Sequence, residues 1–138
     1  MTNDGGPTNP DDPWNLDDWV AYKKRKAHAF VERGYSVEWY PDAGGWMDFY
    51  LPQRKNRYEL RASVKFFQQP SKYGIDGGRI SKLSVMLRET DPIKRVPGES
   101  FYEATRVLYH YDRGLDFDDL AGQTRGRRLY DAVLDELN

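Results

Sequence analysis

Residues 58–87, YELRASVKFFQQPSKYGIDGGRISKLSVML, contain the clearest strand pattern in the chain and decide its fold. From Tyr58 to Phe66, apolar side chains alternate with charged or hydroxyl side chains. This period of two is typical of a strand that has one buried and one solvent-exposed face. It predicts burial of Tyr58, Leu60, Ala62, Val64 and Phe66, and exposure of Glu59, Arg61, Ser63 and Lys65.

A second strand is predicted over residues 79–88. Leu83, Val85 and Leu87 fall on one face, and Lys82 and Ser84 fall on the other. Residues 68–78 between the two strands contain Pro70, Gly74, Gly77 and Gly78. Proline removes a ladder donor, and glycine reaches backbone angles that other residues avoid. The pattern therefore predicts an antiparallel pair joined by a long, shaped loop.

The N-terminal part of the chain predicts a tail followed by a helix. Residues 1–13 are rich in Gly, Pro and Asp and are expected to be a flexible acidic tail, with residues 14–138 as one domain. Asn15 can cap a helix that ends near Gly34. The helical spacing predicts an apolar face of Leu16, Trp19, Val20, Ala27, Phe30 and Val31. Residues 23–26 are four consecutive cations, for which a solvated face is favoured over a nucleic-acid contact.

Further strands and a last helix complete the prediction. Residues 35–40 and 46–51 are aromatic-rich runs typical of a hairpin, and residues 101–111 predict a fifth strand. In that strand the expected faces are Val107, Tyr109 and Tyr111 against Arg106 and His110. Asp116 or Thr124 is expected to cap a helix whose apolar stripe is Leu129, Ala132, Val133 and Leu137. The fold class is α+β: one domain with a meander-like antiparallel sheet of about five strands and a helix at each end.

Composition excludes several classes of function. The chain of 138 residues has a net charge of −1 and no cysteine. Without thiols there is no disulfide and no thiolate chemistry, so we expect a cytoplasmic protein. The first residues are polar and acidic where a signal peptide would be basic and then apolar, and no apolar run is long enough to cross a bilayer. We expect no membrane association.

Signatures of chemistry are weak. The glycine-rich run at residues 74–78 does not match a phosphate-binding loop. Asp112, Asp116, Asp118 and Asp119 could attract a cation, but helix capping already explains carboxylates at this position. An enzymatic alternative would place His110 in a cleft with Asp76 and Asp112. We therefore expect no catalytic residues, no metal and no cofactor.

Binding of another macromolecule is the favoured function. A glycine-shaped loop between two strands can present side chains rigidly to a protein partner. The residues expected to contact it are Tyr73, Asp76, Arg79, Tyr111, Asp112 and Arg113. The alternative is a nucleic-acid-binding accessory protein that combines cations with exposed rings such as Trp39, Tyr50 or Phe67. Its basic set is Lys23, Lys24, Arg25, Lys26, Arg54, Lys55, Arg57, Arg125, Arg127 and Arg128. The oligomeric state is left open.

The motifs also carry a resemblance. The segments RYELRASVKFF, PSKYGIDGGRISKL and YHYDRGLDF, which span residues 57–117, resemble a small family of actinobacterial proteins and proteins of their phages or mobile elements. YGIDGGRISKL is the most specific segment. The resemblance implies a bacterial or phage cytoplasmic setting and draws attention to the loop at residues 74–82. It implies no activity, so no catalytic or binding residue is carried over from it.

Overall fold

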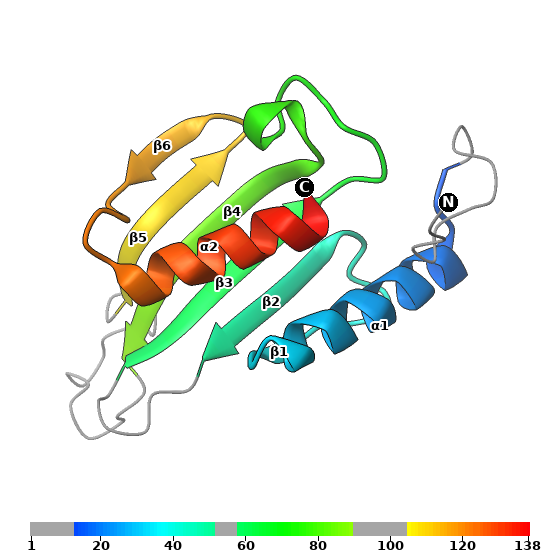
Figure 1. Ribbon diagram of the computed structural model, residues 1–138. Coiled ribbons are helices and arrows are strands. Elements are labelled where there is room, and N and C mark those ends of the chain that lie inside the picture. Colours follow the sequence, from blue (N-terminus) through cyan, green and yellow to red (C-terminus); the bar gives the residue numbers. More distant parts are fainter. Residues whose placement is uncertain (1–12, 52–57, 90–104) are drawn as a thin grey trace, which may run out of the picture.

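The chain forms a six-stranded antiparallel sheet with two helices packed on one face (Figure 1). The computed structural model describes residues 13–51, 58–89 and 105–138. Sheet order follows chain order, so the sheet is a meander, and the predicted α+β class is confirmed. The elements are α1 (Leu16–Glu32), β1 (Ser36–Glu38), β2 (Trp46–Leu51), β3 (Tyr58–Phe66), the 3₁₀ turn η1 (Ile75–Gly77), β4 (Ile80–Glu89), β5 (Thr105–Asp112), β6 (Leu115–Asp118) and α2 (Thr124–Leu137).

The predicted pairing of β3 with β4 is confirmed. Leu60, Ala62, Val64 and Phe66 of β3 are all buried, as are Leu83 and Val85 of β4. The register pairs Ser63 with Ser84 and Lys65 with Lys82, and then shifts so that Phe66 pairs with Ile80. Ser81 is thus the extra residue of a bulge. The bulge places Ile80 and Leu83 on the same buried face although they are three residues apart.

A second register shift corrects the predicted faces of β5. Val85 pairs with Tyr109 and Met86 pairs with Val107, which leaves Leu108 as an extra, buried residue. Val107 is consequently exposed, so the prediction that it shares a face with Tyr109 was wrong. A strict period of two cannot reveal a bulge. Residues 101–104 of the predicted strand lie outside the described residues.

The chain after β5 also differs from the prediction. Residues 112–114 turn the chain and lead into a sixth strand that contains Asp116. The first cap of α2 is Gln123, which makes no side-chain capping bond, so neither Asp116 nor Thr124 caps the helix. The predicted apolar stripe of α2 is confirmed, because Leu129, Ala132, Val133 and Leu137 are all buried.

Helix α1 begins and ends where the sequence predicted. The Asp18 amide donates to Asn15 Oδ1 at 2.9 Å, and the Asn15 amide donates to Asp18 Oδ2 at 3.1 Å, which together form a capping box. Gly34, with φ of +95°, follows the helix in the left-handed conformation that glycine favours. The predicted apolar face was partly wrong, because Leu16 and Val31 are exposed. The predicted tail, apart from Pro13, lies outside the described residues.

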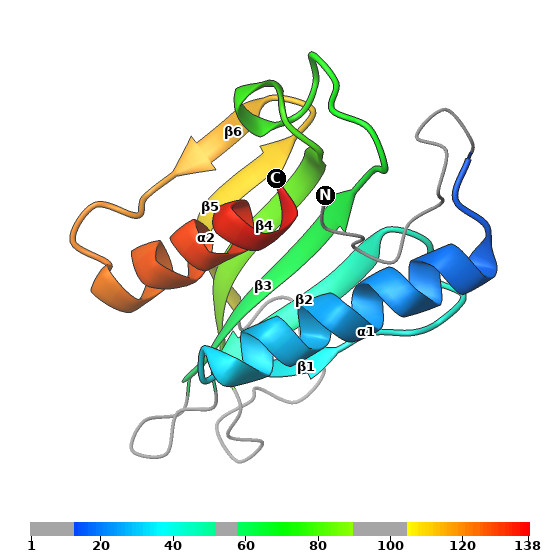
Figure 2. The same cartoon turned by 45° about the vertical axis from the view of Figure 1, so that its right-hand side comes forward.

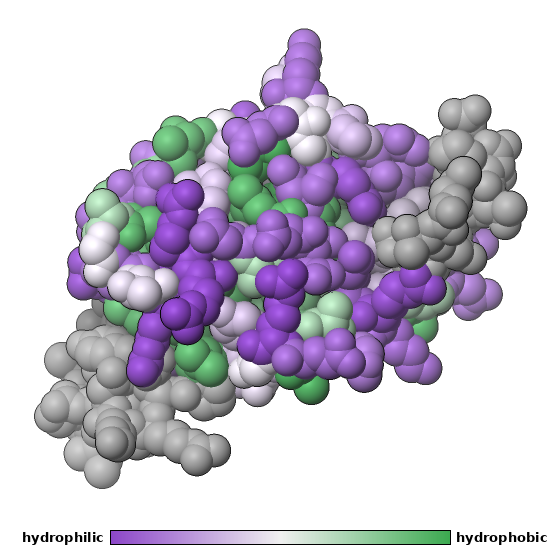
Figure 3. Space-filling view, viewed as in Figure 1, coloured by the Kyte–Doolittle hydropathy of each residue, from purple (hydrophilic) through white to green (hydrophobic). Residues whose placement is uncertain are grey.

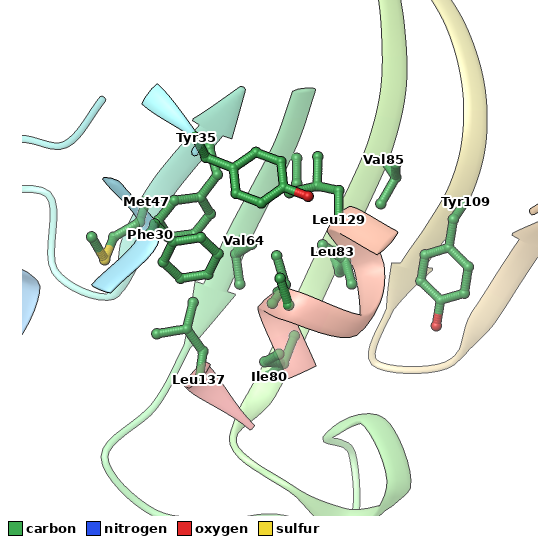
Figure 4. Packing of buried hydrophobic residues seen from close by; sticks show 14 of the residues in the cluster. Phe30, Tyr35, Met47, Val64, Ile80, Leu83, Val85, Tyr109, Leu129 and Leu137 are labelled. Atoms are coloured by element: carbon green, nitrogen blue, oxygen red, sulfur yellow. The ribbon is translucent and has the colours of Figure 1, made fainter. Parts of the chain in front are cut away.

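The core lies between the sheet and the two helices. Phe30 of α1 stacks on Phe49 of β2 with ring centroids 3.6 Å apart, while Leu129 and Leu137 of α2 pack over Val64 and its neighbours (Figure 4). Burial of a single Phe or Leu side chain contributes about 1.5–3 kcal/mol. Figure 2 shows that α1 lies toward the β1 side of the sheet and α2 over its middle. These contacts fix the helices on one face.

The two faces of the sheet therefore have different surroundings. The side of the molecule that bears the helices presents a mainly hydrophilic surface with scattered apolar patches (Figure 3). No helix of the described residues covers the other face of the sheet (Figure 1). That second face is called the open face below.

Candidate interaction surface

The loop between β3 and β4 is held in one shape by the last residue of the chain. The Asn138 Nδ2 group donates to the Ile75 carbonyl at 2.9 Å, and the Ile80 amide donates to Asn138 Oδ1 at 3.0 Å. A Cβ added to Gly78 would lie 2.2 Å from Asn138 Oδ1, so this contact requires glycine. Ile75 is buried beneath the loop. Asn138 and Ile75 therefore anchor the loop to α2 and the core.

The turn between β5 and β6 packs against the same loop. The Tyr111 hydroxyl donates to the Tyr73 carbonyl at 2.8 Å, and the Arg113 amide donates to the Ser81 carbonyl at 2.9 Å. Residues 71–78 and residues 111–114 therefore form one continuous region, which we call the loop–turn surface. Tyr73 is 53% exposed. Of the six predicted partner contacts, five lie in this region: Tyr73, Asp76, Tyr111, Asp112 and Arg113.

Arg79, the sixth, is engaged with other groups. Its Nε donates to the Phe67 carbonyl at 3.0 Å, and its guanidinium lies 5.0 Å from the centroid of the Tyr22 ring and 5.4 Å from that of Trp14. Its Nη2 is buried without a hydrogen-bond partner. Arg79 thus joins the loop to the rings of Trp14 and Tyr22 at the start of the chain's first helix, α1.

The members of the predicted basic set differ in burial and in their partners. Lys23 is fully buried, and its Nζ donates to the Tyr40 carbonyl at 2.9 Å, so the expectation of a solvated cation was wrong here. Burial lowers the pKa of Lys23, and Asp42 partly opposes that shift. Lys26 pairs with Glu136 at 3.5 Å and Arg127 with Asp131 at 3.3 Å. Exposed members on the two helices are Lys24, Arg25, Arg125 and Arg128, whereas Arg54, Lys55 and Arg57 lie outside the described residues.

A buried charge cluster on the open face was missed by the sequence analysis. Arg61, predicted to be in solvent, is only 5% exposed. Its Nη1 donates to Glu38 Oε2 and to Asp48 Oδ2, both at 2.9 Å, and its Nε donates to Glu59 Oε1 at 2.6 Å. The Tyr50 ring lies 4.5 Å away from the guanidinium carbon. Three neighbouring strands are thereby joined through one cation.

The electrostatics of this cluster follow from these contacts. Burial disfavours the charged form of Arg61, but hydrogen bonds to the three carboxylates outweigh it and raise the pKa of Arg61 above its ordinary value. The hydrogen bond from Arg61 lowers the pKa of Glu38. The only sequence signal for the cluster was an acidic residue in each of the three predicted strands concerned, namely Glu38, Asp48 and Glu59.

Another group on the open face combines a cation with two rings. The Lys65 ammonium lies 5.8 Å from the Trp46 ring centroid and 5.5 Å from that of Phe67. Both rings are partly exposed. In such a group the rings can stack on unpaired bases, and the cation can contact the phosphate backbone.

The enzymatic alternative finds no support in the contacts of His110. Its Nδ1 lies 2.8 Å from Ser84 Oγ and its Nε2 lies 3.5 Å from Asp116 Oδ2, whereas Asp112 pairs with Lys82 at 3.8 Å. A cavity of about 750 Å³ opens at the start of α2, and none of His110, Asp76 and Asp112 lines it. Among the described residues, no three His, Asp or Glu side chains are grouped to hold a metal ion. None of the helices described is long and apolar enough to cross a membrane.

Comparison with known proteins places most of the chain in a protein family. A family model described as Domain of unknown function (DUF7678) matches residues 46–138. This span begins with β2 and includes the whole loop–turn surface, but not α1 or β1. No curated protein and no solved structure matches the chain.

Proposed function

We propose that this chain, which belongs to the family of the domain of unknown function DUF7678, is a non-catalytic protein-interaction module that contacts its partner through the loop–turn surface. The observation that carries the proposal is the anchoring of an exposed loop at both of its flanks. Asn138 is hydrogen-bonded to the backbone of Ile75 and Ile80, and the Tyr111 hydroxyl is hydrogen-bonded to the Tyr73 carbonyl. A loop fixed before binding loses little conformational entropy when it binds.

The composition of the loop–turn surface supports a protein partner. It combines an exposed tyrosine with carboxylates of Asp76 and Asp112 and the guanidinium of Arg113. Tyrosine and arginine are enriched among the residues that dominate protein interfaces. The resemblance to actinobacterial and phage or mobile-element proteins makes a cytoplasmic host protein the partner that we propose.

Photocrosslinking tests this proposal directly. Benzoylphenylalanine is introduced in place of Tyr73 and, as a matched control, in place of Val31, which is 57% exposed but lies on α1. We expect discrete crosslinked products in cell extract from position 73 and none of the same products from position 31. Identical products from both positions, or none from position 73, would contradict the assignment of the surface.

A second proposal rests on the Lys65 site. Because its ammonium lies between two partly exposed rings, the open face could stack single-stranded nucleic acid. Binding of a labelled oligothymidylate should then weaken steeply as salt rises, and a Trp46→Ala change should weaken it about tenfold, as loss of one stacking partner does. Absence of binding at low salt would remove this second function.

A further inference from the structure

The strand β6 is an edge strand of the sheet. Among the described elements it pairs only with β5, and all four of its residues are exposed. In Figure 1 it lies on the side of the sheet that is far from α1, and α2 packs on β3 and β4 instead. An edge strand presents every second backbone amide and carbonyl outward, ready to pair with another strand.

The opposite edge of the sheet is protected. β1 is only three residues long and packs against α1. A covering helix is a common way of preventing edge-to-edge pairing. Within the part of the chain that the structure describes, one edge of the sheet is thus packed against a helix, whereas β6 pairs with no further strand. We call β6 the free edge, and it begins directly after the loop–turn surface.

The side chains of β6 select the kind of strand that can pair there. Leu115 is 59% exposed and Phe117 is 46% exposed. The register with β5 shifts between these two residues, so Asp116 is an extra residue whose Oδ2 lies 3.5 Å from His110 Nε2, while Asp118 pairs with Tyr109. Residues 106–119 contain two arginines and four aspartates, a net charge of −2 with His110 neutral. Asp119 is paired with Arg106 at 3.3 Å and Asp112 with Lys82 at 3.8 Å, which leaves the two carboxylates of β6 without a lysine or arginine ion-pair partner among the described residues. The free edge is therefore apolar and acidic.

This charge decides between two possible occupants. A second copy paired through β6 would bring equivalent carboxylates close together, and like charges on paired strands are destabilising. A segment that carries lysine or arginine would instead meet the net negative charge of this region. The charge pattern thus disfavours a second copy and favours a basic partner.

We propose that the edge of β6 accepts an extended basic segment of the partner protein, which adds a seventh, hydrogen-bonded strand to the sheet. This mode of recognition takes its affinity from main-chain hydrogen bonds and its specificity from alternate side chains. The inference rests on the proposed function, because the added strand would run beside the turn at residues 112–114. It goes further by specifying the conformation and the charge of the bound segment.

The test uses the full chain and a defined probe, a blocked fluorescent octapeptide of alternating lysine and threonine. Two control peptides carry glutamate in place of lysine, or N-methyl groups on every second amide. We expect the lysine peptide to bind about tenfold more tightly than either control, because one carries the opposite charge and the other lacks half of its amide donors for the ladder. Hydrogen exchange should show protection of residues 115–118 in the complex.

Matched variants locate the binding site. Asp116→Lys should weaken binding of the lysine peptide about fivefold or more, since it replaces an opposite-charge pair by a like-charge pair. Asp131→Lys introduces the same change at an exposed site on α2 and should leave binding unchanged. Circular dichroism checks that both variants are folded, and Asp116→Asn provides a milder change if the lysine variant is not.

Three results would overturn the inference. The first is failure of the lysine peptide to bind, and the second is equal binding of the N-methylated peptide. The third is a dimer in sedimentation that is lost on substitution at position 116, because that result would assign the edge to a second copy. Crosslinking at position 73 is measured independently of this edge. Crosslinks without peptide binding would overturn only the added strand, whereas peptide binding without crosslinks would overturn only the loop–turn surface.

Discussion

Replacement of Arg61 by methionine probes how strongly the charge cluster joins three strands. Methionine retains an unbranched apolar stem but removes the guanidinium. Asp48, which is mostly buried, then loses its cationic partner, as does the more exposed Glu38. Glu59 keeps only the more distant Arg88, at 3.9 Å. Uncompensated carboxylates in such a position destabilise the folded state.

The magnitude can be worked from the contacts. Removing one partner of a buried ion pair lowers the free energy of unfolding by about 3–5 kcal/mol. Because the side chain of Glu38 is 49% exposed and water can solvate it, we expect the low end, about 3 kcal/mol. Neutralising the neighbours with Asp48→Asn and Glu59→Gln should remove about half of that loss, since fewer charges are left unpaired.

Urea unfolding followed by tryptophan fluorescence measures the effect. With an m-value of about 1.5–2 kcal/mol per M, the midpoint of Arg61→Met should fall by about 1.5–2 M. The control Arg127→Met removes an exposed helical pair with Asp131 and should change the free energy of unfolding by at most about 0.5 kcal/mol. If Arg61→Met unfolded at the same midpoint as the control, the cluster would contribute no net stability and the reasoning would be refuted.

The stability of the wild type and that of Arg61→Met should respond differently to acid. Arg61 lowers the folded-state pKa of Glu38 below its ordinary value of 4.5. The stability that this contact supplies is therefore present above pH 4.5 and is lost as the pH falls through the lower folded-state pKa. In Arg61→Met the contact is absent at every pH. The gap in stability between wild type and variant should accordingly narrow on acidification.

Three further predictions concern buried contacts. Asn138→Ala removes both hydrogen bonds that anchor the loop and should lower the free energy of unfolding by about 1–3 kcal/mol. Hydrogen exchange over residues 74–80 should become faster. Unchanged exchange would mean that the loop holds its shape without Asn138. Gly45→Ala would place a Cβ 2.0 Å from the Phe66 carbonyl oxygen and should lower the thermal midpoint, while Gly114→Ala, which meets nothing within 4 Å, should not; equal midpoints would contradict the packing. Burial lowers the pKa of Lys23 below 10.5, so the folded state loses this proton before the unfolded chain does, and stability should rise with pH toward 10.5. Lys23→Met should abolish that rise in urea titrations at several pH values; a rise of the same size in the variant would assign it to another group.

The sequence predicted those elements that depend on local pattern. The alternation from Tyr58 to Phe66 and the box of Asn15 with Asp18 act over a few residues, and both are present in the fold. The β6 strand was missed because LDFD is short and its aspartates also suit a helix start. The face of Val107 was wrong because a bulge on β5 depends on its pairing with β4.

The charged interior could not be predicted from local pattern. Lys23 and Arg61 belong to runs that resemble solvent-exposed faces, and only the folded chain shows the acceptors that surround them. The carbonyl of Tyr40 lies 17 residues from Lys23, and Glu38 lies 23 residues from Arg61. The region around the loop was predicted from its glycines, but its anchor at Asn138 is 63 residues from Ile75. Such partners depend on tertiary structure.

The sequential order of the strands has a consequence for how the molecule folds. Each strand pairs with the next one along the chain, so the sheet can grow hairpin by hairpin through short loop closures, which is typical of rapid folding. The bonds from Asn138 to residues 75 and 80 close much longer loops and require α2 to be docked. The loop should therefore reach its final shape only in the last step, and a folding intermediate with a complete sheet should still be unable to bind through it.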